Sequence, residues 1–204
     1  GGMAAFIPSR RDPAVNARAL EKVREDKDRE AAMGFDGSWV AHPDLVPVAR
    51  GSFDRVLGGT PNQKQRQRDD VVVTQEALLD VRIPGARVTE AGVRTNVRVA
   101  LEYIGNWLEG RGAVGIDNLM EDSATAEISR TQLQQWIAHG VVLDDGLPLT
   151  HQRYHEIREA ELVTLGGAAG PSARLREAAG LLDRLAEQPV PEEFLTLGAY
   201  ERLG

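Results

Sequence analysis

The stretch Asn118-Leu119-Met120-Glu121-Asp122-Ser123-Ala124-Thr125-Ala126-Glu127-Ile128-Ser129-Arg130 has the composition of a helix start in the middle of the chain. It follows a glycine-rich loop at 110–115, and two adjacent carboxylates, Glu121 and Asp122, lie where the helix is predicted to begin. Carboxylates at a helix start usually cap it, because their oxygens accept hydrogen bonds from the free N–H groups of the first turn. A site between two packed elements is the alternative for this position.

Asp122 is the candidate site residue of this stretch. As an N-cap it would be stabilised in its charged form by backbone N–H groups and by the helix dipole. This stabilisation keeps the carboxylate ionised at neutral pH and also makes it a weak base. Such a group can still remove a weakly acidic proton where a strong electrophile nearby stabilises the resulting anion. The residues alone favour a capping role and leave catalysis open.

The composition excludes several classes of function. The chain has 204 residues, with 42% hydrophobic and 27% charged residues, which suits one large or two small domains with a core. The formal net charge of -7 argues against sequence-independent binding of nucleic acid. Without cysteine there is no thiol catalysis and no disulfide. No apolar run approaches the roughly 18 residues of a membrane span, and no targeting segment is apparent, so we expect a cytoplasmic protein without membrane contacts.

The first 57 residues alternate between strand and helix patterns. Short apolar runs at 3–7 and 38–42 are expected to be strands. Helices are expected at 13–32, where Asp12 is a good N-cap, and at 45–57. Strand–helix–strand–helix order with short connections is typical of an α/β fold with parallel strands. Because the chain opens directly on a strand of this kind, we expect it to be a piece of a longer protein.

A polar break separates this part from the rest of the chain. Residues 58–70 contain glycines followed by a basic and polar run, which usually means a solvated linker; a phosphate-contacting loop is the rival interpretation. Everything after residue 70 has helical patterns. Helices are expected at 75–81, at 89–108, from the opening stretch to 140, at 151–165 and from 171 onward. The predicted organisation is an α/β part at 1–57, a linker at 58–70 and a helical domain at 71–204.

Histidines are candidates for metal binding or catalysis. His151 and His155 are spaced i, i+4 on a predicted helix, with Glu159 one turn further, and this spacing can hold a divalent metal. No fixed third ligand comes from elsewhere, and no Glu follows the first His as in the metalloprotease motif, so structural roles are favoured. His42 ends a predicted strand, where barrel active sites collect residues, and a half-buried structural histidine is equally compatible.

The remaining motifs carry weaker signals. Trp39 could face the interior or the mouth of a barrel, and a large aromatic is more often a core residue than a substrate wall. Gly110-x-Gly112-x-x-Gly115 follows a helix rather than a strand, so the context of a dinucleotide-binding loop is missing. No Gly-x-Ser-x-Gly elbow occurs, and a Ser–His–Asp triad cannot be read from the spacing.

Three blocks of the sequence resemble signature blocks of the malate synthase family, in its shorter A type. They are MAAFIPSR at 3–10, DGSWVAHPDL at 36–45 and NLMEDSATAEISR at 118–130, with further matches in order at 61–63, 92–96 and 194–197. Blocks this long and collinear are far more specific than one short motif. The resemblance implies a (β/α)8 TIM-type barrel, whose last two strand–helix units would be residues 1–57, followed by a mainly helical C-terminal domain that plugs the mouth of the barrel.

The resemblance also implies an activity. Malate synthases condense acetyl-CoA with glyoxylate and hydrolyse the thioester, giving malate and CoA in the glyoxylate bypass. The Asp of the family's Met-Glu-Asp motif maps onto Asp122 and is the general base. Trp39 matches a tryptophan near the glyoxylate pocket, and Met3 and Pro43 are expected to line the substrate channel. Ser123 stands where the family commonly has Ala, and it would compete with Asp122 to cap the helix.

The resemblance places the rest of the active site outside this sequence. Family enzymes use magnesium, bound by a Glu and an Asp together with glyoxylate, and an Arg that stabilises the enolate, and all three residues lie upstream of the first matching block. We therefore expect no metal ligand in this chain, a missing N-terminal barrel portion as its partner, and no malate formation by the chain alone. The alternative is a non-catalytic helical interaction module, and the sequence preceding Gly1 would discriminate between the two.

Overall fold

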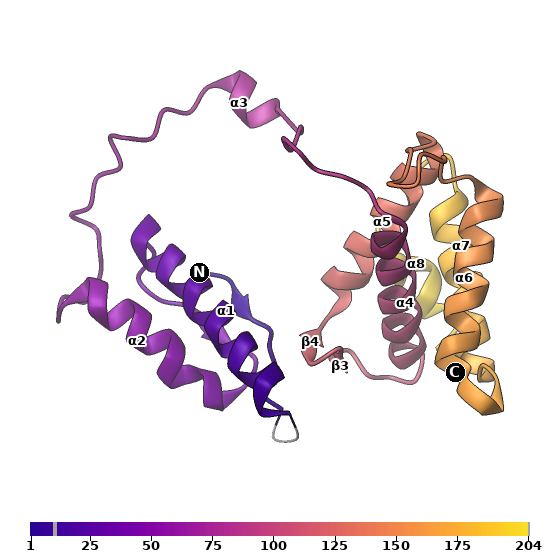
Figure 1. Ribbon diagram of the computed structural model, residues 1–204, viewed down its shortest axis with the longest axis horizontal. Coiled ribbons are helices and arrows are strands. Elements are labelled where there is room, and N and C mark those ends of the chain that lie inside the picture. Colours follow the sequence, from indigo (N-terminus) through magenta and orange to yellow (C-terminus); the bar gives the residue numbers. More distant parts are fainter. Residues whose placement is uncertain (10–11, 204) are drawn as a thin grey trace. The chain divides into compact units, whose positions relative to one another are not determined.

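The computed structural model describes residues 1–9 and 12–203, so Arg10, which closes the first matching block, Arg11 and Gly204 lie outside the described residues. The chain divides into two compact units (Figure 1). Unit 1 contains Gly1–Pro84 and Asp117–Met120, and unit 2 contains Gly85–Ile116 and Glu121–Gly204. A short segment of the opening stretch therefore belongs to the N-terminal unit, although the residues on both sides of it belong to the other.

Unit 1 is built on two strand–helix pairs. Its elements are β1 (Met3–Ala4), α1 (Pro13–Met33), β2 (Trp39–Val40), the 3-10 turn η1 (Pro43–Leu45), α2 (Val46–Leu57) and α3 (Gln75–Leu79). The strands β1 and β2 are parallel, with Met3 opposite Trp39, and α1 packs against α2 (Figure 1). The parallel arrangement predicted from the order of strands and helices is confirmed.

The bounds of α1 follow from local chemistry. The Oδ1 atom of Asp12 accepts hydrogen bonds from the backbone N–H groups of Ala14 and Val15, both at 3.0 Å. Gly34 ends the helix with a φ of 105°, a left-handed conformation that glycine adopts without a steric penalty. Both ends of the helix could therefore be predicted from single residues.

The apolar core of unit 1 is small. Its buried hydrophobic cluster is drawn from β1, the residues after it, α1 and η1, and consists of Ala4, Phe6, Val23 and Leu45. Lys27 of α1 is also fully buried, and its Nζ donates to the Gly2 carbonyl at 2.7 Å and to Glu30 at 3.0 Å. A buried ammonium group needs such partners, and here they attach the start of β1 to α1.

A β-hairpin precedes the helix of the opening stretch. Its strands are β3 (Val114–Ile116) and β4 (Leu119–Glu121), and the turn residues Asp117 and Asn118 have φ values of 49° and 62°. Positive φ at both turn residues is typical of the tight type I′ hairpin turn, in which Asn and Asp are well tolerated. The prediction of a loop that leads directly into a helix was wrong here, because three-residue strands carry too little periodicity to be recognised.

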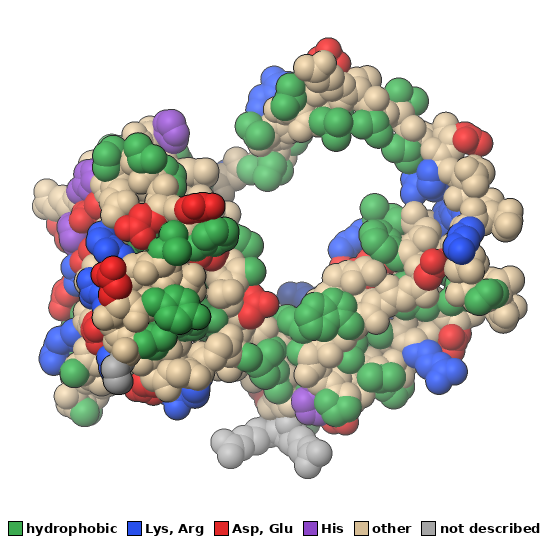
Figure 2. Space-filling view, turned by 180° about the vertical axis from the view of Figure 1, so that it is seen from behind, with side chains coloured by type: hydrophobic (Ala, Val, Ile, Leu, Met, Phe, Trp, Pro, Cys, Tyr) green, Lys and Arg blue, Asp and Glu red, His purple; other side chains and the backbone are tan. Residues whose placement is uncertain are grey.

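The segment between α2 and unit 2 is mostly exposed. At its start, the Gln63 Nε2 donates to the carbonyls of Ala31 at 3.0 Å and Phe35 at 2.7 Å, which anchors it to unit 1. Farther along, α3 has no buried residue, and hydrophobic side chains lie on the surface around it (Figure 2). Unit 2 begins at Gly85, later than the predicted boundary at 71, because residues 71–84 bury no side chain that would join them to the helical core.

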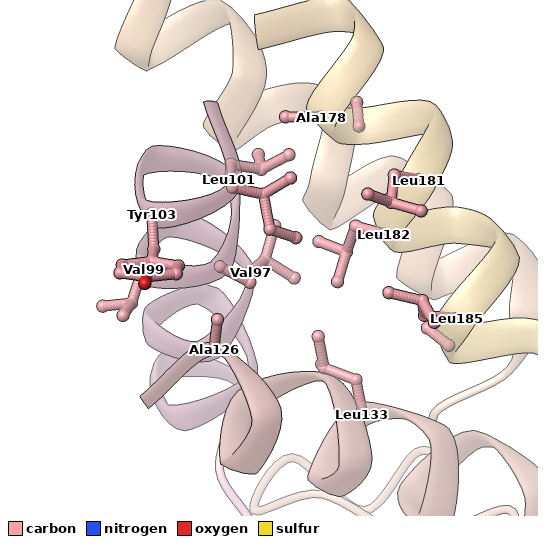
Figure 3. Packing of buried hydrophobic residues seen from close by; sticks show 14 of the residues in the cluster. Val97, Val99, Leu101, Tyr103, Ala126, Leu133, Ala178, Leu181, Leu182 and Leu185 are labelled. Carbon is pink, nitrogen blue, oxygen red and sulfur yellow. The ribbon is translucent and has the colours of Figure 1, made fainter. Parts of the chain in front are cut away.

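Unit 2 is a helical bundle around α4. Its helical elements are α4 (Glu90–Trp107), α5 (Ser123–Ala138), α6 (His151–Gly166), the 3-10 turn η2 (Gly167–Ala169), α7 (Ala173–Glu187) and α8 (Leu195–Tyr200). The helix α4 packs against α5, α6 and α7. Figure 3 shows how side chains of three helices converge, among them Val97 and Leu101 of α4, Leu133 of α5 and Leu182 of α7. None of the helices in the described residues has the length and apolar content needed to cross a membrane.

Candidate active site

Asp122 is the N-cap of α5. Its backbone is extended, with φ of -123° and ψ of -172°, and its Oδ1 accepts a hydrogen bond from the Ala124 N–H at 2.9 Å. The helix begins at Ser123, so the expected competition from Ser123 does not displace Asp122 from the cap. The residue is exposed, and within the described chain the Ala124 N–H is the one hydrogen-bond donor to its carboxylate. The second carboxylate oxygen is therefore available to a ligand.

Tyr103 of α4 is a neighbour of Asp122 that sequence reasoning missed. Its side chain is 1% exposed, and its hydroxyl donates to the Gly112 carbonyl at 2.9 Å. Burial raises the pKa of Tyr103, the negative charge of Asp122 raises it further, and a hydrogen bond with Ser123 lowers it. Tyr103 therefore stays neutral. In the sequence, its position beside the apolar stripe of α4 was the feature from which its burial could have been predicted.

Glu121, adjacent to Asp122, is held by the first turn of α5. The Thr125 hydroxyl donates a short hydrogen bond to its Oε2 atom. This bond joins the residue before the cap to the third residue of α5, so it fixes the Glu121 side chain against the start of the helix. The structure thus gives the two adjacent carboxylates different surroundings, because Glu121 has a side-chain partner and Asp122 has a backbone partner.

Met3, Trp39 and Pro43, the other site residues inferred from the resemblance, all belong to unit 1. Met3 and Trp39 are opposite each other on the parallel strands, and Pro43 opens η1 just after β2. Asp122 belongs to unit 2. The Trp39 side chain is 60% exposed, so the core position expected for a large aromatic is wrong for this unit.

Apolar grooves flank the two parallel strands. The groove beside β2 has a volume of about 440 Å³, and Trp39 lines it together with Val46, Phe53 and Leu57 of the α2 region. The groove beside β1 has a volume of about 220 Å³ and is lined by residues that include Met3, Phe6, Val23 and Leu119. Two of the three site residues in unit 1 therefore lie at the rims of grooves rather than in a closed core.

His42 has a structural role. Its Nδ1 accepts a hydrogen bond from the Asp44 N–H at 3.1 Å and so caps η1. Of the two interpretations that the sequence left open, this geometry favours the half-buried structural histidine. A ring nitrogen engaged in capping is not free to act as a base.

His151 and His155 share a carboxylate on the neighbouring helix α7. The Oε1 atom of Glu187 lies 2.7 Å from His155 Nε2 and 3.3 Å from His151 Nδ1. Arg158 Nη2 lies 3.1 Å from His155 Nδ1, and because a guanidinium can only donate, that nitrogen must accept. His155 then carries its hydrogen on Nε2 and donates to Glu187, which is the wrong tautomer for a metal ligand at that nitrogen.

The structural role favoured for this histidine pair fits these contacts. Glu159, which the sequence placed as a possible third ligand, pairs with Arg158 at 2.6 Å instead. Glu187 was missed, since it lies on a helix remote in sequence. In the part of the chain that the structure describes, no group of three or more His, Cys, Asp or Glu side chains could hold a metal ion. The prediction that magnesium ligands lie elsewhere stays a prediction.

Comparison with known proteins covers nearly the whole chain. A family model described as "Malate synthase, TIM barrel domain" matches residues 1–81, and one described as "Malate synthase, C-terminal" matches residues 87–203. The stretch between the two matches, 82–86, contains the start of unit 2 at Gly85.

Similar curated proteins come from distant organisms. A protein of Streptomyces clavuligerus named malate synthase is 58% identical over all of this chain, and one of Myxococcus xanthus with the same name is 44% identical. A protein of Ricinus communis named "Malate synthase, glyoxysomal" is 42% identical, again over all of this chain. The chain spans 38% of the length of the first two relatives and 37% of the third.

Proposed function

The chain belongs to the malate synthase family, and from this premise we propose that it is the part of a malate synthase that carries the general base, Asp122. The reaction is the condensation of acetyl-CoA with glyoxylate, followed by hydrolysis of the thioester to malate and CoA in the glyoxylate bypass. The observation that carries the proposal is the match to both family domains in order along the chain. The exposed, singly hydrogen-bonded carboxylate of Asp122 supports it.

In this proposal Asp122 removes a proton from the acetyl methyl group of acetyl-CoA. The carbon of the resulting enolate attacks the aldehyde carbon of glyoxylate, and the aldehyde oxygen takes up a proton as the new C–C bond forms. Water then cleaves the thioester, which releases malate and CoA. The Ala124 N–H donates to the Asp122 carboxylate and fixes its orientation, and Tyr103, which burial keeps neutral, adds no second negative charge.

The residues of unit 1 are proposed to contact substrate. Trp39 and Met3 are adjacent on parallel strands, and Pro43 follows the end of β2. In (β/α)8 barrels the active site lies at the carboxyl ends of the strands, which supports a place in the substrate channel for Pro43. Trp39 at the glyoxylate pocket and Met3 in the channel are proposed from the resemblance, since each is the first residue of its strand. The same argument supports residues 1–57 as the last two strand–helix units of the barrel.

Two further parts of the proposal rest on the family. Magnesium finds no ligand set in the described residues, so its binding, and the Arg that stabilises the enolate, are proposed for the remaining barrel portion of the protein. A cytoplasmic location is also proposed, although the relative from Ricinus communis is named glyoxysomal.

The test is Asp122→Asn in a full-length protein that carries this chain, for example a fusion to the N-terminal part of the Streptomyces clavuligerus relative. We expect kcat for CoA release to fall about 10²–10⁴-fold, as for the loss of a general base. Binding of acetyl-CoA and helix content should stay unchanged, because Asn caps a helix about as well as Asp.

Asp12→Asn is the matched control. Asp12 caps α1 through the same kind of Oδ1 hydrogen bonds, so the same chemical change should leave turnover unaffected. If Asp122→Asn retains turnover, the base is another residue. If the unmodified protein releases no CoA from acetyl-CoA and glyoxylate with magnesium, the proposed activity is wrong.

A further inference from the structure

The tip of the β3–β4 hairpin is joined to the strand that starts the chain. The Ile7 N–H donates to the Asn118 carbonyl at 2.7 Å, and the Met120 N–H donates to the Ala5 carbonyl at 2.7 Å. Phe6 and Leu119 form the antiparallel bridge between these two bonds. Residues 118–120 therefore pair antiparallel with residues 5–7, which follow β1, and this pairing explains why the hairpin tip belongs to unit 1.

The side chains of the bridge residues Phe6 and Leu119 line one groove. Phe6 is 8% exposed and belongs to the small core of unit 1. Leu119 lines the groove beside β1 together with Met3 and Phe6. The hairpin tip is thus held by two short backbone hydrogen bonds, and its Leu119 lines the same groove as Phe6.

The turn of the hairpin has an uncommon backbone conformation. Asp117 and Asn118 are the only non-glycine residues with positive φ in the part of the chain that the structure describes. Such conformations are costly for most side chains and persist where the surrounding structure over-determines them, often at functional sites. Asn and Asp are the residue types that tolerate them best, so the turn fits this sequence while remaining sensitive to substitution.

The hairpin tip immediately precedes Asp122. Asp122 lies two positions after Met120, with only Glu121 between them, and this length of chain spans at most ~7 Å. On the other side, the Asp122 carboxylate is fixed to the Ala124 N–H. The backbone around the carboxylate is therefore anchored on both sides, at Met120 by the strand after β1 and at Ala124 by the first turn of α5.

We propose that the Asp117–Asn118 turn and Met120 are positioning residues for Asp122, acting through the pairing of 118–120 with Ala5–Ile7. The inference rests on the proposed function, because it assigns these residues to the placement of the same base. They touch no reacting atom themselves. Their effect is to restrict the backbone from which the carboxylate extends, so loss of the pairing should reduce kcat and leave KM for acetyl-CoA little changed.

The test compares two substitutions at one position in a full-length protein that carries this chain. Asn118→Val places a β-branched residue at positive φ, which the turn does not tolerate, whereas Asn118→Gly preserves it. We expect Asn118→Val to lower kcat by about 10–100-fold, the scale of a small misplacement of a catalytic group. Asn118→Gly should keep kcat near the unmodified value. Amide hydrogen exchange at Ile7 and Met120 should quicken in Asn118→Val and stay slow in Asn118→Gly.

Each outcome bears on the proposal. If Asn118→Val shows fast exchange at both amides but an unchanged kcat, the pairing does not position Asp122 and the proposal is wrong. If the two amides stay protected in Asn118→Val, the turn does not maintain the pairing, and its positioning role is wrong. If Asn118→Val does not fold, Ile7→Pro removes the N–H that bonds to the Asn118 carbonyl without altering the hairpin, and it should lower kcat to a similar extent. An unmodified protein without turnover would contradict the proposed function instead, while the exchange measurement would still test the pairing.

Discussion

The two units differ in how completely each buries its apolar surface. Among the described residues, the buried cluster of unit 2 draws on all of its helices from α4 to α8, whereas that of unit 1 has four members. The strands of unit 1 are flanked by open apolar grooves on both sides. A strand with an unpaired edge and a helix with an uncovered face are stable only when another element is added. The helical unit therefore resembles a finished domain, and the α/β unit resembles a section cut from one.

The largest expected effect of this difference is on independent folding. A polypeptide of residues 85–204 should be helical and unfold in a single cooperative transition, because it contains the whole of the larger core. A polypeptide of residues 1–84 should show no cooperative transition, because its few buried hydrophobic residues, four of which form its core cluster, cannot offset the conformational entropy of its chain. Thermal unfolding followed by circular dichroism measures both. A sharp transition for 1–84 would contradict the inference that unit 1 lacks a core large enough to fold by itself.

An intermediate effect is expected from the same substitution in each unit. Leu182 and Leu45 are both fully buried, in unit 2 and unit 1 respectively. Leu182→Ala should lower the free energy of unfolding by about 2–5 kcal/mol, since the packed bundle cannot close the cavity. Leu45→Ala should cost less, because the neighbouring grooves let the surroundings relax. Urea unfolding of the two variants checks the order, and an equal or larger loss for Leu45→Ala would contradict it.

The smallest effect concerns alkaline pH and is specific to unit 2. Tyr154 is fully buried, its hydroxyl donates to Asp183 at 2.9 Å, and burial raises its pKa well above the ordinary value, with the Asp183 charge adding to the rise. A tyrosine whose folded pKa exceeds its unfolded pKa contributes stability that is complete below pH ~10 and is lost as pH rises further. Tyr154→Phe should therefore flatten the loss of stability above pH ~10.

Removing the Tyr154 hydroxyl also has a cost at neutral pH. The hydrogen bond to a charged group is worth about 1.5–3 kcal/mol, and Asp183 keeps two contacts with Arg158, at 3.1 and 3.0 Å, which limits the loss. Tyr200→Phe is the matched control, since that ring is 66% exposed. The comparison of Tm against pH for the two variants tests the assignment. Identical alkaline profiles for the unmodified protein and Tyr154→Phe would show that another group governs the loss.

Several helix bounds could be read from the sequence because they depend on neighbouring residues. Thr89 and Thr150 cap α4 and α6 by accepting hydrogen bonds from N–H groups three residues on, and threonine just before a helical pattern is a typical N-cap. Gly34 ends α1 in a left-handed conformation. In the same way, Asp122 was predicted to stand at the start of a helix, and it caps α5.

The surroundings of the candidate site could not be read in this way. Glu187 meets the two histidines of α6 from α7, a helix remote in sequence, and the Tyr103 hydroxyl meets the loop after α4. The residue type alone favoured a core position for Trp39, yet its side chain is exposed, because exposure depends on which elements pack over β2. These contacts depend on packing between residues that are remote in sequence, and neither hydrophobic periodicity nor helix capping predicts such packing.

The sequence by itself determined the order of strands and helices, the parallel strands, the caps and the family, because these follow from local hydrogen bonding, from periodicity and from collinear blocks of residues. Only the tertiary structure decided that the residues just before Asp122 form a strand paired with Ala5–Ile7. The physical reason is that a three-residue strand has no stability of its own and forms only where a distant segment offers free backbone donors and acceptors.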